Sequence, residues 1–220
     1  MTLTPATTRR GSGVRSRPMS DARAAPDRPV DETSIEDAQI LAATRRWVER
    51  AVIGLNLCPF ARAPFIRGRL HFRISHARET DDLLADLREE LEALQAADPN
   101  VRETTLLIHP HVLTDFYEYN DFLYAADAEV LALGLEGDLQ IASFHPEYRF
   151  ADTVADAVEN FTNRSPYPML HLLRESSIDI AVEALTDTDE IYRRNIETLR
   201  RLGADGWRAL LRNDGDATRD

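Results

Sequence analysis

The chain has 220 residues, of which 43 % are apolar and 29 % are charged, and its net charge at pH 7 is −12. This length fits one domain with a sizeable core, and the composition is typical of a globular protein. Residues 1–30 carry six arginines and two aspartates, a local charge of +4 that leaves −16 for the other 190 residues. A domain this acidic is expected to repel nucleic acid, because binding nucleic acid depends on neutralising phosphates.

Cysteine content and hydropathy indicate the compartment. Cys58 is the only cysteine, which excludes an internal disulfide and fits a reducing environment. No window has the apolar length of a membrane helix, and the first residues lack the apolar core of a signal peptide. We therefore expect a cytoplasmic protein with no membrane partner.

The two ends of the chain differ from its middle. Residues 1–33 are rich in Arg, Ser, Thr, Ala and Pro, so they bury too little apolar surface to fold and are expected to form a disordered basic tail. Met19 is an alternative start, which leaves open whether residues 1–18 belong to the native protein. Residues 34–211 are predicted to form a single α/β domain, and residues 212–220 a polar tail.

The first part of this domain alternates between helical and extended patterns. Ser34 with Asp37 resembles a capping box, and Thr80 and Thr114 are placed as N-caps of the next two helices. The predicted elements are a helix from Ser34 to Gly54, a loop over 55–69, strands over 70–75, 104–109 and 139–144, and helices over 80–97 and 114–134.

The last part is less regular. Residues 151–161 are predicted as a short helix, 163–168 as a loop and 189–203 as a final helix. Residues 169–185 fit a helix, or a fourth strand followed by a helix. We favour the helix, because Ser165–Pro166 resembles a helix start. The fold class that follows is α/β, with a three- to four-stranded, largely parallel sheet flanked by helices in a single domain.

Each of the three predicted strands ends at a histidine: His109 is the last residue of the second strand, and His76 and His145 directly follow the first and the third. The carboxyl ends of parallel strands meet at one edge of a sheet, where α/β proteins bind their ligands. A proline after His109 and another after His145 end these strands and restrict the backbone of the histidine. The prolines are thus expected to fix the direction in which the two imidazoles point.

Imidazole at such an edge is suited to metal binding and to acid–base catalysis. We place His109, His145 and His171 as candidate ligands of a divalent metal such as zinc. The candidate catalytic residues are His109, His145, Cys58 as a thiol, and Glu147 as a base or an orienting carboxylate. Two structural alternatives stay open. Each His–Pro pair can be a turn whose imidazole caps a backbone carbonyl, and Cys58 can be a small buried hydrophobe.

A second group of candidates lies in the segment 163–175, NRSPYPMLHLLRE. A helix that begins at Ser165 would offer free N–H groups to an anion, and Arg164 would add a guanidinium. On that helix His171 and Glu175 would share one face. Asp115, just after the second strand, is a further ligand-binding candidate. The alternative is a capped helix with a solvated arginine.

Four segments are similar to the signature blocks of a bacterial family that is defined as a domain of unknown function. The resemblance covers about residues 38–205 and implies that Cys58, His109, His145, Arg164 and His171 lie in characteristic blocks of that family. It implies no activity. The four segments are GLNLCPFA (54–61), YNDFL (119–123), LEGDLQIASFHPEYRF (135–150) and TNRSPYPMLHLLRE (162–175).

Together these observations favour an enzyme that acts on a small anionic molecule, as a hydrolase or in metal-assisted transfer, with a histidine-centred site at the carboxyl ends of the strands. A non-catalytic module that binds an anion or nucleotide through Arg164 and the helix start at Ser165 is the first alternative. A protein-interaction adaptor is the second. The sequence contains neither a P-loop nor a GxGxxG dinucleotide fingerprint.

Overall fold

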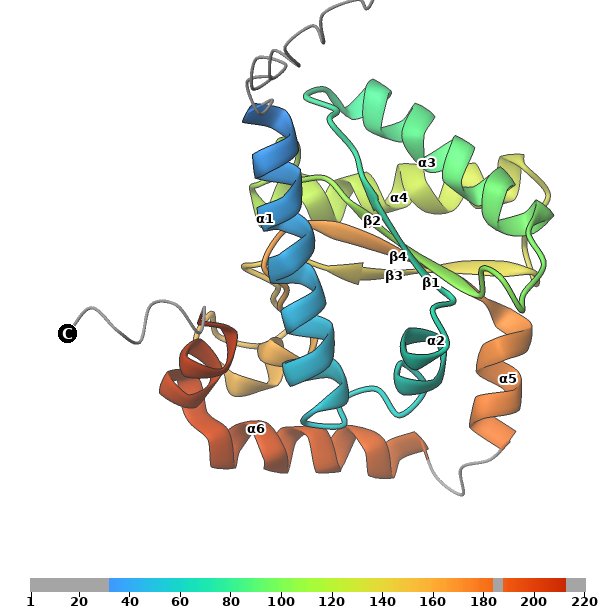
Figure 1. Ribbon diagram of the computed structural model, residues 1–220. Coiled ribbons are helices and arrows are strands. Elements are labelled where there is room, and N and C mark those ends of the chain that lie inside the picture. Colours follow the sequence, from blue (N-terminus) through green and yellow to red (C-terminus); the bar gives the residue numbers. More distant parts are fainter. Residues whose placement is uncertain (1–31, 184–187, 213–220) are drawn as a thin grey trace, which may run out of the picture. The chain divides into compact units, whose positions relative to one another are not determined.

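The computed structural model of the protein describes residues 32–183 and 188–212, and side chains within 34–179 and 191–212. These residues form one four-stranded sheet with helices on both faces (Figure 1). The predicted tails, residues 1–33 and 212–220, lie almost wholly outside the described ranges and stay predictions.

The sheet is mixed, so the prediction of a largely parallel sheet is wrong. Its spatial order is β1 (Leu70–Ile74), β2 (Thr104–Ile108), β4 (Met169–Arg174) and β3 (Leu139–Phe144). β1 and β2 are parallel, whereas β4 is antiparallel to both β2 and β3. β1, β2 and β3 nevertheless run in one direction, and their carboxyl ends share one edge, as predicted. The segment between β3 and β4 returns from that same edge without a crossover, which makes β4 antiparallel.

The helix that we favoured over 169–185 is also wrong, and the open alternative of a strand followed by a helix is confirmed. Met169 and Leu170 pack into the cores on opposite faces of the sheet, as the alternation of a central strand requires. The helix that follows, α5 (Glu175–Glu183), begins ten residues after Ser165. Ser165 instead donates its hydroxyl to Tyr167 O at 2.6 Å. The helix start on which the predicted anion site at Ser165 depended is therefore wrong.

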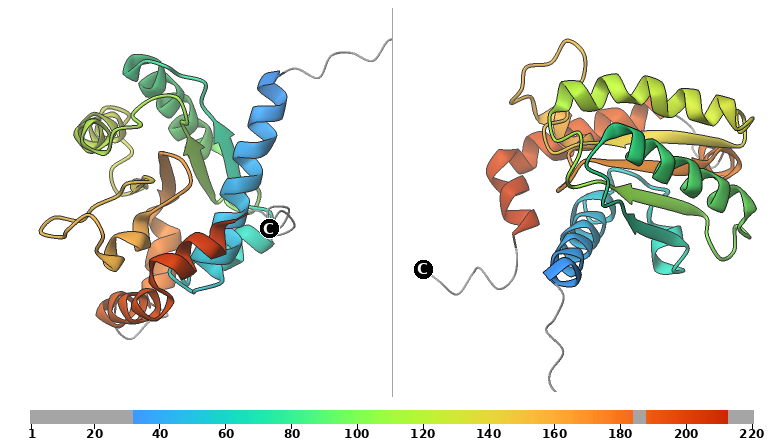
Figure 2. Two further views of the ribbon diagram at one scale, coloured as in Figure 1. Left: turned by 90° about the vertical axis from the view of Figure 1, so that its left-hand side faces the viewer. Right: turned by 90° about the horizontal axis from the view of Figure 1, so that it is seen from above.

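Two helices cover one face of the sheet, α3 (Thr80–Ala96) and α4 (Phe116–Ala132), as both views in Figure 2 show. α3 carries the predicted leucine stripe, and it starts at Thr80 without a side-chain cap. The cap of α4 is Asp115 rather than Thr114, because an Asp115 carboxylate oxygen accepts from Tyr117 N at 2.8 Å and Glu118 N at 3.1 Å. The buried leucines of the stripe are Leu83, Leu87, Leu91 and Leu94.

The other face is covered by α1 (Glu32–Trp47), which continues as a π-helix, η1 (Val48–Ile53), and ends at Gly54. A Cβ at Gly54 would lie 2.3 Å from Arg50 O, so this exit from the π-helix requires glycine. The predicted loop over 55–69 contains one short helix, α2 (Arg62–Ile66). Single π turns recur at functional sites, and this one leads directly into the loop that carries Cys58.

The remaining elements are short or interrupted. Residues 151–157 form turns in place of the predicted helix over 151–161, because the buried Asn160 amide binds the backbone of this stretch at Phe150 and Val154. A 3-10 helix, η2 (Val158–Asn163), follows, and α6 (Thr188–Leu211) is broken at Gly203, whose φ is 67°. In the described part of the chain, no helix combines the length and the apolar character that crossing a membrane requires.

Candidate functional site

The predicted site residues divide between the two ends of the sheet. At the carboxyl ends of β1–β3 lie His109 and His145, below a surface cavity of about 360 Å³ that we call the edge pocket. At the opposite end lies a cavity of about 290 Å³ that we call the Cys58 pocket. The residues that line each pocket are given below.

His109 and His145 are fully buried on the face covered by α4, and both bind the loop between β2 and α4. His109 Nδ1 lies 3.0 Å from Val112 O, and His145 Nε2 lies 3.2 Å from Leu113 O. Because a carbonyl only accepts, both ring nitrogens donate. Leu113 has a φ of 56°, so the two imidazoles hold a backbone conformation that leucine rarely adopts. The interpretation of the His–Pro pairs as carbonyl-capping turns is confirmed.

These bonds define the protonation state of both rings. His145 Nδ1 accepts from the Glu147 amide at 3.0 Å, so both nitrogens of His145 are engaged. His109 Nε2 is buried and has no hydrogen-bond partner among the described residues. Burial lowers the pKa of His109 to about 4, and it also lowers the pKa of His145. Both imidazoles are therefore neutral at pH 7.

His171 lies apart from these two histidines. It sits in the middle of β4, between Leu106 of β2 and Ala142 of β3. It shares its side of the strand with Met169, which packs under α1, whereas His109 stacks on Tyr119 of α4. No group of three or more His, Cys, Asp or Glu residues within the described ranges is arranged to hold a metal. Catalytic or metal-binding roles for His109, His145 and His171 stay predictions.

The edge pocket holds two guanidinium groups. Arg164 is fixed, because its Nη2 donates to Ala155 O at 2.6 Å and its Nε to Tyr148 O at 3.4 Å. Its guanidinium also lies 4.8 Å from the centre of the Phe161 ring. The second guanidinium is that of Arg149. The pocket is lined by Asp115, Phe116, Tyr117, Pro146, Glu147, Arg149, Ala155, Asp156 and Arg164.

Three carboxylates line the same pocket, and they differ in what they bind. Asp115 is occupied as the cap of α4. Glu147 and Asp156 make no side-chain hydrogen bond and no ion pair within the described part of the chain. Burial lowers the pKa of Arg164, while Asp156 and Glu147 act in the opposite direction. The pocket therefore presents two guanidiniums beside two carboxylates with no such partner.

The Cys58 pocket brings together two other predicted residues, Cys58 and His171. His171 Nε2 lies 2.7 Å from Thr104 Oγ1, and that hydroxyl lies 2.6 Å from Leu172 O. Burial raises the pKa of the Cys58 thiol, although the backbone amides of Phe60 and Ala61 bind the sulfur and act in the opposite direction. The pocket is lined by residues 58–61, Ala63, Pro64, Leu70, Glu103, Thr104, His171, Leu173, Arg174, Ser177 and Ile178.

Two predicted ligand-binding residues line neither pocket. The Ser165 side chain is buried and bonded to Tyr167 O. Glu175 begins α5, and its amide donates to Asp138 O at 2.9 Å. The prediction that Glu175 stands behind His171 on one helix face is wrong, because the two residues belong to different elements.

Sequence reasoning missed Arg149, Asp156 and Thr104. Arg149 follows Glu147 by two residues in HPEYR, so the strand-end segment itself contained a signal for it. Asp156 comes from turns with no periodic pattern. Thr104 joins the Cys58 pocket only because β4 pairs with β2, and that pairing has no sequence signature.

Comparison with known proteins identifies a family. The model of a family described as "Protein of unknown function (DUF1415)" matches residues 39–209. No curated protein and no solved structure matches the chain.

Proposed function

The chain belongs to this family of unknown function, and we propose that it is a cytoplasmic enzyme acting on a small anionic molecule bound in the edge pocket. The observation that carries this proposal is the pair Arg149 and Arg164, which lines one cavity together with Glu147 and Asp156, two carboxylates without a hydrogen bond or ion pair among the described residues. That cavity lies beyond the carboxyl ends of the strands, where α/β sheets bind ligands.

Arg164 would hold the anionic group. Two carbonyl bonds and the Phe161 ring already fix its guanidinium, so little side-chain freedom is lost when a ligand binds. Its remaining N–H groups match a carboxylate or phosphate in geometry and charge. Arg149 adds a second guanidinium, which is held through its bond to the Tyr117 hydroxyl at 3.1 Å.

Glu147 would be the acid–base group. Its carboxylate has no described partner, while its backbone amide is fixed by His145 Nδ1 at 3.0 Å. A carboxylate positioned beside a bound anion can transfer a proton to or from it, as hydrolysis requires. In this proposal His145 and His109 act indirectly, because they hold the segments that carry Glu147 and Asp115.

The anion-binding part is tested by calorimetric titration with inorganic phosphate and with malonate at low salt. We expect Arg164→Met to weaken binding at least tenfold, because a charge-assisted hydrogen bond contributes roughly 1.5–3 kcal/mol. Arg208→Met is the matched control, since Arg208 forms an exposed ion pair with Asp205 at 3.0 Å, far along the chain in α6. Equal binding by wild type and Arg164→Met would contradict the proposal.

The enzymatic part needs a different readout. Wild type and Glu147→Gln are incubated with the small-molecule fraction of a cell extract, and consumption of anionic compounds is followed by mass spectrometry. We expect a compound that wild type and the exposed control Glu92→Gln consume and that Glu147→Gln does not. Equal consumption by wild type and Glu147→Gln would exclude Glu147 as the acid–base group.

A non-catalytic anion-binding module is the second candidate, because Arg164 and Arg149 by themselves support binding. The helix start at Ser165, which the sequence assigned to this module, is not part of it, because no helix starts at Ser165. Anion binding that depends on Arg164, with no compound consumed, would favour this module over the enzyme.

A further inference from the structure

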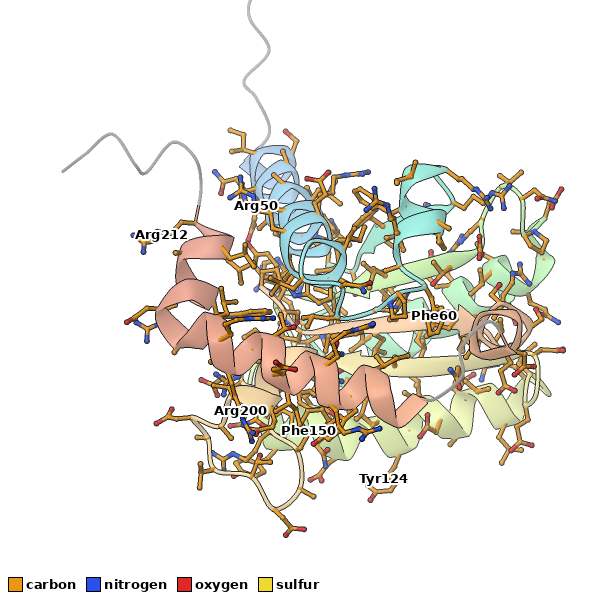
Figure 3. All side chains as sticks on the ribbon, turned by 90° about the horizontal axis from the view of Figure 1, so that it is seen from below. Arg50, Phe60, Tyr124, Phe150, Arg200 and Arg212 are labelled. Carbon is orange, nitrogen blue, oxygen red and sulfur yellow. The ribbon has the colours of Figure 1, made fainter. Side chains whose placement is uncertain are left out.

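The Cys58 pocket is separate from the edge pocket. It is bordered by Leu70 and Thr104, the first residues of β1 and β2, whereas the edge pocket is bordered by residues that follow β3. The two cavities therefore lie at opposite ends of the sheet. Phe60, which Figure 3 labels, lines the Cys58 pocket, as does Ile178 of α5.

The hydrogen bonds of His171 leave one acceptor unused. Thr104 Oγ1 has a single proton, which it donates to Leu172 O at 2.6 Å, so it accepts from His171 Nε2 at 2.7 Å. The Nε2 nitrogen thus carries the proton, and Nδ1 of the neutral ring is an acceptor. Within the described part of the chain, Nδ1 has no hydrogen-bond partner.

The polar groups of this pocket are mostly uncharged. Its apolar surroundings lower the pKa of His171 to about 4 and raise that of Cys58, so the ring and the thiol are neutral at pH 7. Glu103 is paired with Arg69 at 3.7 Å. Arg174 points away, because its guanidinium donates to Leu94 O and Ala97 O at the end of α3, on the other face of the sheet.

The loop that carries Cys58 is held in a fixed place. Asn195 of α6 is buried, and its Nδ2 donates to Leu57 O at 2.8 Å. A residue of α6 thus fixes the backbone next to Cys58. Cys58 is half-buried and lines the pocket, so a molecule bound there is expected to shield it from reagents.

We propose that the Cys58 pocket is a second ligand site, which binds a small, uncharged, largely apolar molecule with a hydroxyl or N–H group that donates to His171 Nδ1. The volume of about 290 Å³ is at the lower end for small-molecule sites. The guanidinium of Arg174 is directed to the other face of the sheet, and an anion in this pocket would lie beside Glu103.

Three probes of similar shape separate the contributions of the hydrogen bond, the apolar contact and charge to binding. Benzyl alcohol has a hydrogen-bond donor, toluene has none, and benzoate carries a negative charge. The chain has one cysteine, so protection of Cys58 from N-ethylmaleimide reports occupancy without background. We expect benzyl alcohol to protect at a concentration about tenfold lower than toluene, as one hydrogen bond predicts. We expect benzoate to give no protection.

A spectroscopic readout tests the acceptor itself. Benzyl alcohol is expected to shift the ¹⁵N resonance of His171 Nδ1, and toluene is expected to leave it unchanged. Ala63→Trp fills the mouth of the pocket from an exposed position and should abolish protection. Ala125→Trp on the exposed side of α4 is the control. Arg164→Met should leave protection intact, which keeps this site independent of the proposed function.

Protection of Cys58 by benzoate as strong as that by benzyl alcohol would overturn the proposal. So would protection that survives Ala63→Trp, or the failure of all three probes to protect Cys58.

Discussion

The two ends of the sheet use histidine in opposite ways. At the carboxyl ends of β1–β3, His109 and His145 are fully buried, and the N–H group of each ring donates to a backbone carbonyl of the same loop. At the other end His171 borders a pocket with one nitrogen anchored to Thr104 and the other unused. A histidine at a strand end is therefore no direct sign of a site. What matters is whether the fold leaves a ring nitrogen facing a cavity.

The two pockets also differ in polarity, because one is largely charged and the other largely apolar. The edge pocket is made of charged side chains from loops, and its rigid support is the buried histidine pair beneath it. The Cys58 pocket is lined mostly by apolar side chains, with the neutral Cys58 and His171 among them, and its two charged residues are Glu103 and Arg174. An anion fits the first, and an uncharged molecule fits the second.

The largest expected effect is a loss of unfolding free energy at acidic pH, caused by the buried His109. The pKa of His109 is about 4 in the folded chain and about 6.5 when unfolded. Only the unfolded chain takes up this proton between these values, so stability is full above pH 6.5 and falls toward pH 4. The shift corresponds to about 3 kcal/mol. His109→Asn, which keeps a donor for Val112 O, should reduce the slope of unfolding free energy against pH, measured in urea.

His76→Asn is the control for this slope, because His76 is exposed at the same edge of the sheet, where it lies 3.4 Å from an Asp37 carboxylate oxygen and stacks on His111. A slope in His109→Asn equal to that of wild type would mean that His109 does not titrate as a buried base.

The next largest effect is expected at Gly54, where the π-helix leads into the loop that carries Cys58. Gly54→Ala places a Cβ 2.3 Å from Arg50 O, a backbone atom that cannot move aside alone. We expect a loss of about 2 kcal/mol in unfolding free energy and faster alkylation of Cys58. Gly206→Ala is the comparison, because the atoms nearest to its Cβ belong to the flexible side chain of Leu202. If Gly206→Ala costs as much as Gly54→Ala, the π-helix exit does not require glycine.

The smallest effect separates capping from ligand binding at Asp115. Asp115→Ala should lower the free energy of unfolding by about 1 kcal/mol, because two amides at the start of α4 lose their acceptor. Asp115→Asn should retain most of that stability. Thermal unfolding of both variants checks this. Loss of phosphate binding in Asp115→Asn at full stability would return Asp115 to the ligand-binding residues.

The sequence predicted β1, β2 and β3, whose alternating or apolar patterns are local properties. It failed at β4, because MLHLLR is apolar enough for either a helix or a buried strand, and only its pairing with β2 and β3 decides. The same limit applies to the site. The strand-end rule placed Asp115 and Glu147 at one edge, and both line one pocket. Arg164 lines the same pocket, although it was predicted from a helix start at Ser165 that the structure does not contain. The meeting of Cys58 with His171 depends on the position of β4 and has no local signal.

The most direct test of the account is an NMR titration of the wild-type protein with inorganic phosphate, in which the arginine Nε–H and histidine ring resonances are followed. The account predicts saturable shifts of Arg164 and Arg149, with the His171 ring unchanged. Shifts of His171 without any shift of Arg164 would contradict it, because the anion would then bind at the end of the sheet that we assign to an uncharged ligand.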